Sequence, residues 1–176
     1  MLDVPVLETE RMTLVPLGDD HRDGVRALWS QPAVVRHSGR VLDAFGIPIM
    51  MPMTSLDDAD RLIAFWRKAQ ADDWGCRWAM LLGAAQAFAG MVGFNALRPA
   101  AEIAYHLHPD YWGQGLMLEA CEAALDWRLA DKDVARIDAF VEPVNGRSIA
   151  LAKRLGMTAT GDMSEGAERY SREVGA

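Results

Sequence analysis

The segment around Gly113 and Gly115 is where residue types and spacing point most directly to chemistry. An alternating run ends at Pro109, the two glycines follow, and helical spacing begins directly after them. The first amides of a helix have no intrahelical partner and lie at the positive end of its dipole, so they attract anions. Glycine has no Cβ, which lets the backbone come close to such a ligand. A diphosphate is the natural occupant of this turn.

On this segment alone another interpretation stays open, because a Gly-x-Gly turn also serves as a tight connection between a strand and a helix. Two other phosphate motifs are excluded. The turn is not a P-loop, because no Lys-Ser/Thr pair follows it. It is not a dinucleotide fingerprint, because the third glycine is missing and Met117 and Leu118 follow.

A second helix start lies at Asn145. This residue can cap a helix that ends at Gly156, with an inward face formed by Ile149, Ala152 and Leu155. On these residues alone, Asn145 and Ser148 are cap residues, because short polar side chains bind the free amides of a first turn.

The elements around these segments predict the fold class. Alternation predicts strands at 7–17, 77–82, 87–95, 101–108, 135–142 and near 168–174. Helical spacing predicts helices after Asp19, after Ser55, at about 115–130 and at about 146–155. An irregular apolar segment, 39–53, covers either the core or a substrate pocket. Three consecutive short strands followed by strand–helix–strand favour a mixed α/β sheet over a doubly wound one.

Composition narrows the function. The chain has 176 residues without a repeat or a flexible linker, so we expect one domain, 1–176. A net charge of −7 argues against a nucleic-acid partner. The sequence shows no signal peptide, no membrane-spanning run and no CxxC pair, so we expect a cytoplasmic protein with reduced thiols. We expect no metal.

The two helix starts together resemble a known family. The glycine loop resembles the pyrophosphate motif of the GNAT N-acetyltransferases, usually Gln/Arg-x-x-Gly-x-Gly/Ala. Asn145-x-x-Ser148 with Leu155-Gly156-Met157 resembles the second motif of that family. The opening segment 7–14 and the run 111–115 look like the branch that includes the Rim-type ribosomal-protein N-terminal acetyltransferases. The resemblance covers nearly the whole chain, in the right order.

This resemblance implies a mostly antiparallel sheet that splays at the CoA site, with helices on both faces. Pantetheine would fill the gap and bond the backbone of His106, Leu107 and His108. The pyrophosphate would bind the amides of Gly113, Gln114, Gly115, Leu116, Met117 and Leu118. Asn145 and Ser148 would contact pantetheine or lie near the thioester. Arg147 either reaches a CoA phosphate or is simply exposed.

The implied reaction is direct attack of an amine on the thioester of acetyl-CoA, a co-substrate. A base is required because the amine is mostly protonated near neutral pH. Alternation places one group of side chains on one face of the predicted strand: Glu102, Ala104, His106 and His108. Related enzymes carry a base on this strand, so Glu102 is our candidate and His106 the second choice. Alternatively, Glu102 is solvated or paired with an arginine.

Two departures affect the implied site. Trp112 stands at the first position of the pyrophosphate motif and Met117 at its last small position, but backbone donors are unaffected. Many relatives protonate the thiolate with a tyrosine seven residues after the asparagine, and that position is Ala152. Ser148, Tyr170 or a water must take this role, and we favour Ser148. The tail also looks short, with only residues 162–174 left for the usual two-stranded hairpin.

The sequence does not identify the acceptor amine. The apolar segment 45–53 would suit a small or hydrophobic amine, whereas Asp57, Asp58 and Asp60 would suit a protein N-terminus. A non-catalytic acyl-CoA-binding module is the alternative to an enzyme. Many relatives pair, and we leave self-association as a homodimer open.

Overall fold

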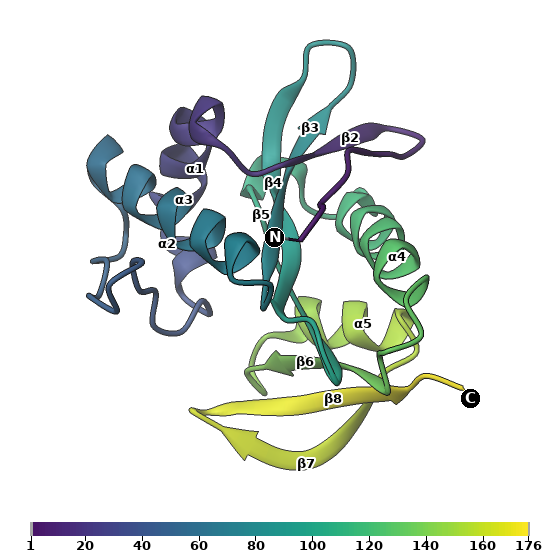
Figure 1. Ribbon diagram of the computed structural model, residues 1–176. Coiled ribbons are helices and arrows are strands. Elements are labelled where there is room, and N and C mark those ends of the chain that lie inside the picture. The colour runs from purple at the N-terminus through teal and green to yellow at the C-terminus, as the bar shows by residue number, and fades with distance from the viewer. Residues whose placement is uncertain (1, 176) are drawn as a thin grey trace.

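The computed structural model describes residues 2–175 and contains one eight-stranded sheet in the order β1-β2-β3-β4-β5-β6-β8-β7 (Figure 1). The strands are β1 Leu7–Glu8, β2 Met12–Pro16, β3 Cys76–Leu82, β4 Ala87–Ala96, β5 Ala100–Leu107, β6 Arg136–Val141, β7 Thr158–Ser164 and β8 Ala167–Glu173. The α-helices are α1 Arg22–Trp29, α2 Pro32–Val35, α3 Leu56–Ala71, α4 Leu116–Leu129 and α5 Gly146–Arg154. β5 and β6 are parallel, and the other neighbours are antiparallel. The predicted mixed sheet is confirmed.

Helices cover both faces of this sheet, which gives the protein two apolar cores (Figure 1). Leu28 of α1 and Ile63 of α3 are fully buried on one face. Ala120 of α4 and Ala152 of α5 are fully buried on the other. Helix α3 starts at its predicted cap, where Ser55 Oγ accepts a hydrogen bond from an amide in the first turn. The central strands β3 and β4 therefore have two buried faces.

The strands β5 and β6 separate after a short paired start. Their register joins Ala100 to Arg136, Ala101 to Ile137 and Glu102 to Asp138, and the later residues of the two strands are not paired with each other. β5 continues to Leu107 on β4, while β6 continues on β8. An open strand edge offers free backbone groups to an extended ligand. The splay expected from the family resemblance is therefore present.

The neighbouring strand β4 carries a bulge at Asn95. Ile103 of β5 pairs with Phe94, but Glu102 pairs with Ala96, so Asn95 is the extra residue. An extra residue bends a strand and redirects its side chain. Asn95 is thereby held next to Glu102, the last residue of β5 that pairs with β6.

Three expectations from the sequence need correction. The strand expected at 7–17 is two strands, because Thr9 closes a turn onto Met12 through its backbone and hydroxyl. The tail is not short of a strand, since β7 and β8 form a hairpin whose turn has positive φ at Glu165 and Gly166. All residues of β7 are exposed, so no alternation marks it. The segment 45–53, expected to suit a small or hydrophobic amine, instead covers the core with Ile49 and Met53, and none of its residues lines the cavity described below.

None of the helices described between residues 2 and 175 is long and apolar enough to span a bilayer.

We expect Gly93→Ala to destabilise the protein, because strands β3 and β4 touch at this glycine. A Cβ there would lie 2.2 Å from the Cys76 carbonyl oxygen and 2.9 Å from Arg77 Cα. Both neighbours are backbone atoms, so the strands must separate, at a cost of roughly 1–3 kcal/mol. Urea unfolding measures this loss. Gly18→Ala is the control, since its nearest atom is 4.0 Å away, and an equal loss in both variants would contradict the prediction.

Candidate active site

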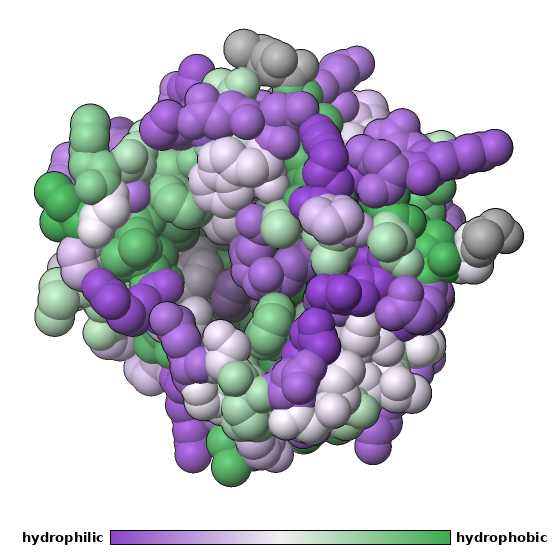
Figure 2. Space-filling model, turned by 60° about the horizontal axis from the view of Figure 1, so that its bottom comes forward, coloured by the Kyte–Doolittle hydropathy of each residue, from purple (hydrophilic) through white to green (hydrophobic). Residues whose placement is uncertain are grey.

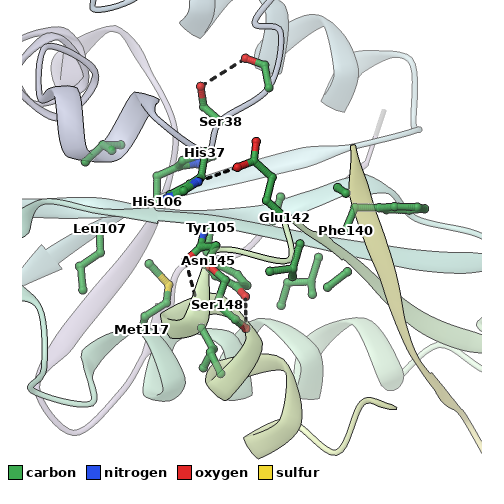
Figure 3. A pocket seen from close by; sticks show the side chains of 18 of the residues that line it. His37, Ser38, Tyr105, His106, Leu107, Met117, Phe140, Glu142, Asn145 and Ser148 are labelled. Carbon is green, nitrogen blue, oxygen red and sulfur yellow. Dashed lines mark hydrogen bonds and ion pairs between the residues drawn. The ribbon is translucent and has the colours of Figure 1, made fainter. Parts of the chain in front are cut away.

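A cavity of about 1050 Å³ opens where β5 and β6 separate. The hollow is visible on one face of the molecule (Figure 2), and side chains from several elements converge on it (Figure 3). The candidate residues from the sequence that line it are Glu102, His106, Leu107, Gly113, Gly115, Leu116, Met117, Leu118, Asn145 and Ser148. Residues that are far apart in the chain are thus brought to one site.

His108 and Gln114 are not part of this lining. The His108 amide donates to the Ala89 carbonyl at 2.8 Å and its carbonyl accepts from Tyr111 N at 3.0 Å. The N–H of His108 is therefore already used by the fold, and the expected bond from it to pantetheine needs correction. Gln114 instead presents its carbonyl to an arginine, as described below.

The glycine loop has the backbone geometry of an anion site. Gly113 and Gly115 have φ of 75° and 76°, a left-handed conformation that glycine adopts without steric cost. The amide of Glu119 makes a bond of 3.2 Å to the Gly115 carbonyl, so the amides before it precede the helical ladder. Helix α4 has 14 residues, and its dipole adds positive potential at these amides.

Arg11, in the turn between β1 and β2, braces this loop from outside the cavity. Its Nη1 donates to the Gln114 carbonyl at 2.8 Å, and its Nε donates to Glu119 Oε2 at 2.7 Å. Its backbone amide donates to the other carboxylate oxygen at 2.8 Å. Although partial burial acts in the opposite direction, hydrogen bonds from Thr9 and Arg11 hold the pKa of Glu119 below its usual value. One side chain thus fixes both the loop and the first turn of α4.

Trp112, the departure at the first motif position, connects the loop to other elements. Its Nε1 donates to the Leu107 carbonyl at 2.8 Å. The guanidinium carbon of Arg147 lies 4.2 Å above its ring, within cation–π distance. Arg147 is exposed, as one of the two interpretations expects, and it also lines the cavity together with Gly113 and Gly115.

Glu102 is the last residue of β5 that pairs with β6, so the gap between these two strands begins there. Its Oε1 accepts a hydrogen bond of 2.6 Å from Asn95 Nδ2, and the Asn95 oxygen accepts in turn from Arg77. Its hydrogen-bond partner is an amide rather than an arginine, and the residue is half-buried. Glu102 lines the cavity with both of these residues.

His106 lies on the same face of β5 as Glu102 but is a poor candidate base. Its ring centroid is 4.4 Å from that of Trp29, and its Nδ1 is inaccessible and unpartnered among the described residues. Burial, assisted by the charge of Arg77, lowers the pKa of His106 to about 3. An imidazole with this pKa binds a proton too weakly to take one from an ammonium group.

The two hydroxyl groups considered as the source of the thiolate's proton, those of Tyr170 and Ser148, differ in their position relative to the cavity. Tyr170 is buried in the core and does not line the cavity. Ser148 lines it at the start of α5, where Asn145 Oδ1 accepts from the Ser148 amide at 3.3 Å. The Tyr105 hydroxyl, which the sequence analysis did not select, donates to the Ser148 carbonyl at 3.4 Å. Burial raises the pKa of Tyr105, so it keeps its proton.

The cavity also contains a carboxylate–imidazole pair that was not predicted from the sequence. His37 Nδ1 and Glu142 Oε2 are 2.6 Å apart, across the opening between the segment after α2 and the end of β6 (Figure 3). Both line the cavity. The two residues are 105 positions apart and His37 lies in irregular chain, so no local pattern could have paired them. Between residues 2 and 175, no three His, Cys, Asp or Glu side chains are grouped to hold a metal.

Comparison with known proteins identifies the family. Residues 11–158 match the acetyltransferase (GNAT) domain. The chain belongs to the GNAT family. It therefore transfers an acetyl group from acetyl-CoA to an amine, and it is an enzyme rather than a non-catalytic acyl-CoA-binding module.

Three similar proteins illustrate the range of GNAT relatives. The uncharacterized N-acetyltransferase p20 of Bacillus licheniformis is 28% identical over 152 residues, which cover 85% of this chain and 80% of that protein. An acetyltransferase from Agrobacterium tumefaciens has 23% identity and a TM-score of 0.75, covering 98% and 96% of the two chains. RimL, a ribosomal L7/L12 α-N-protein acetyltransferase bound to coenzyme A, has 19% identity and a TM-score of 0.79, covering 97% and 98%. The expected likeness to the Rim-type fold is confirmed.

Arg11→Ala should weaken the binding of acetyl-CoA, by roughly 10-fold, because the glycine loop loses the side chain that orients it. Isothermal titration calorimetry with acetyl-CoA measures this change. Arg26→Ala, an exposed arginine on α1, is the matched control. Arg11→Lys keeps the charge but cannot contact the Glu119 carboxylate and the Gln114 carbonyl together. Full affinity for acetyl-CoA in that variant would show that these paired hydrogen bonds do not orient the loop.

Proposed function

We propose that the pantetheine arm of acetyl-CoA lies between β5 and β6 as an added strand. The observation that carries this proposal is the pairing of the two strands at only three positions. Beyond them, the backbone of His106 and Leu107 borders the cavity on one side, with Asn145 and Ser148 at the start of α5. The amides of pantetheine need backbone partners of this kind.

The diphosphate of CoA then falls on the amides from Gly113 to Leu118. These groups lie before the first intrahelical bond of α4 and are brought close to a ligand by two glycines in left-handed conformation. Arg147, stacked on Trp112 beside this loop, supplies the positive side chain that the motif lacks at its first position. It contacts a phosphate of the same ligand.

Glu102 is the base in this proposal, directly or through a water molecule. It removes a proton from the acceptor ammonium, and the neutral amine attacks the thioester carbon. The carbon–sulfur bond of the tetrahedral intermediate then breaks, and the attacking nitrogen loses its second proton to solvent to become the neutral amide. The thiolate of CoA takes up a proton, which we assign to the Ser148 hydroxyl. Ser148 regains its proton from solvent. Both residues line the cavity, from opposite faces of the splayed sheet.

The acceptor in this proposal is a small primary amine with an apolar or aromatic body. The aromatic side chains that line the cavity from the side of α1 and α3 are Trp29, Phe65, Trp66 and Trp74. The carboxylates that would favour a protein N-terminus, Asp57, Asp58 and Asp60, do not line the cavity, and Asp58 pairs with Arg61 and Asp60 with Arg22. RimL acts on a ribosomal protein, but likeness of fold does not transfer that substrate.

The remaining expectations accompany this proposal. Residues 1–176 act as one domain, supported by the single sheet that spans the chain. The protein works in the cytoplasm without a metal, a nucleic acid or a membrane. Self-association stays open.

Acetyl-CoA should raise the thermal unfolding temperature, whereas NAD and ATP should not. A ligand at about 100 times its dissociation constant stabilises the native state by roughly 2.7 kcal/mol. The three ligands are compared at equal concentration. A shift with NAD or ATP alone would mean that the glycine loop binds a different diphosphate.

Glu102→Gln should lower kcat by roughly 10²- to 10⁴-fold while acetyl-CoA still binds. The loss should be largest at low pH, where the amine is most protonated. Thiol release is followed with whichever of 2-phenylethylamine, spermidine and a peptide with N-terminal serine reacts fastest. Glu122→Gln, an exposed carboxylate outside the cavity, is the control. An unchanged pH–rate profile in Glu102→Gln would remove this residue as the base.

A further inference from the structure

We propose that Asn95, supported by Arg77, is a positioning residue that holds the Glu102 carboxylate in place for proton transfer. This inference rests on the role of Glu102 given under the proposed function. Asn95 does not touch the reacting atoms. It acts through Glu102, and it is brought there by the bulge in β4.

The bulge explains why an asparagine reaches this carboxylate. In an unbroken antiparallel ladder, the residue after Phe94 would pair with Glu102 in register. Here Ala96 takes that pairing, and Asn95 is left without a ladder position beside it. A residue freed in this way can aim its side chain along the sheet instead of across it. The bulge therefore presents an amide group to the start of the β5–β6 gap.

The donor and acceptor chemistry fixes the orientation of this amide. A guanidinium only donates hydrogen bonds and a carboxylate only accepts them. Asn95 Oδ1 must therefore face Arg77, and Nδ2 must face Glu102, which it meets at 2.6 Å. In the reverse orientation the Asn95 NH2 group would face the Arg77 guanidinium, donor against donor, and its oxygen would face the Glu102 carboxylate, acceptor against acceptor. The network consequently has one arrangement.

Arg77 is itself held rigidly. Its Nη1 donates to the Cys76 carbonyl at 3.0 Å, and its guanidinium carbon lies 3.7 Å above the Trp66 ring. Trp66 packs edge-on against Phe65 at a centroid distance of 4.9 Å. Burial lowers the pKa of Arg77 to about 10, so it still carries its charge near neutral pH. A charged guanidinium with only 4% of its residue exposed is costly unless its partners are well arranged.

This arrangement leaves one carboxylate oxygen of Glu102 free to accept a proton. Oε1 accepts from Asn95, whereas Oε2 has no hydrogen-bond partner among the side chains and backbone of the described residues. A carboxylate bound through one oxygen has a fixed plane and presents the second oxygen in one direction. Since a misplacement of about 1 Å can cost 100-fold in rate, this restraint matters for a base.

The test is a double-mutant cycle between Asn95 and Glu102, followed by thiol release with the acceptor used for Glu102→Gln. Asn95→Ala removes the donor. Asn95→Asp keeps the shape and the acceptor for Arg77 but cannot donate to Glu102. We expect both variants to lower kcat by about 10- to 100-fold, with an unchanged KM for acetyl-CoA. In the Glu102→Gln background, neither change should lower kcat further.

Two results would overturn the positioning role alone. One is full kcat in Asn95→Asp, which would mean that Asn95 serves only to hold Arg77 in the fold. The other is a kcat of the double variant that equals the product of the two single losses, which would mean that Asn95 and Glu102 act independently. If Glu102→Gln itself has no effect, the proposed base falls and this inference falls with it. Thermal unfolding of each variant with and without acetyl-CoA shows whether it is folded and binds the co-substrate.

Discussion

The separation of β5 from β6 is the constraint on which the rest of the site depends. Two parallel strands that begin paired and then part leave backbone groups without partners, and such groups are costly unless a ligand or water satisfies them. The cavity forms at that point, and both helix starts, α4 and α5, open onto it. An acyl carrier with amides and a diphosphate matches both features. The open strand edge and the two helix starts therefore match the position proposed for acetyl-CoA.

Each face of the splayed sheet contributes a different function to this site. The face covered by α1 and α3 carries a polar network of Arg77, Asn95 and Glu102 within an aromatic surround. The face covered by α4 and α5 carries Tyr105 and Ser148, next to the expected position of the thioester sulfur. In the proposed mechanism, Glu102 removes a proton from one side of the sheet and Ser148 returns one from the other.

Much of this could be predicted from the chain because the signals are local. Gly113 and Gly115 mark a strand-to-helix turn, Ser55 caps α3, and Glu102 shares a strand face with His106. The exposed strand β7 gave no alternation and was missed. The pair of His37 and Glu142 and the bracing by Arg11 join residues more than 100 positions apart, which depend on tertiary packing. Local periodicity contains no information about such contacts.

The departures from the family pattern have physical compensations that only the structure reveals. Trp112 replaces the polar residue usual at its position. Its Nε1 donates to the Leu107 carbonyl of β5, and the Arg147 guanidinium from helix α5 stacks on its ring. Ala152 lacks a hydroxyl and is fully buried, yet Tyr105 reaches from the neighbouring strand to the same helix. At each departure another residue brings a charge or a hydroxyl to the cavity: Arg147 beside Trp112, and Ser148 with Tyr105 where Ala152 has none. A motif is therefore better judged by which chemical groups reach the ligand than by the residue at each position.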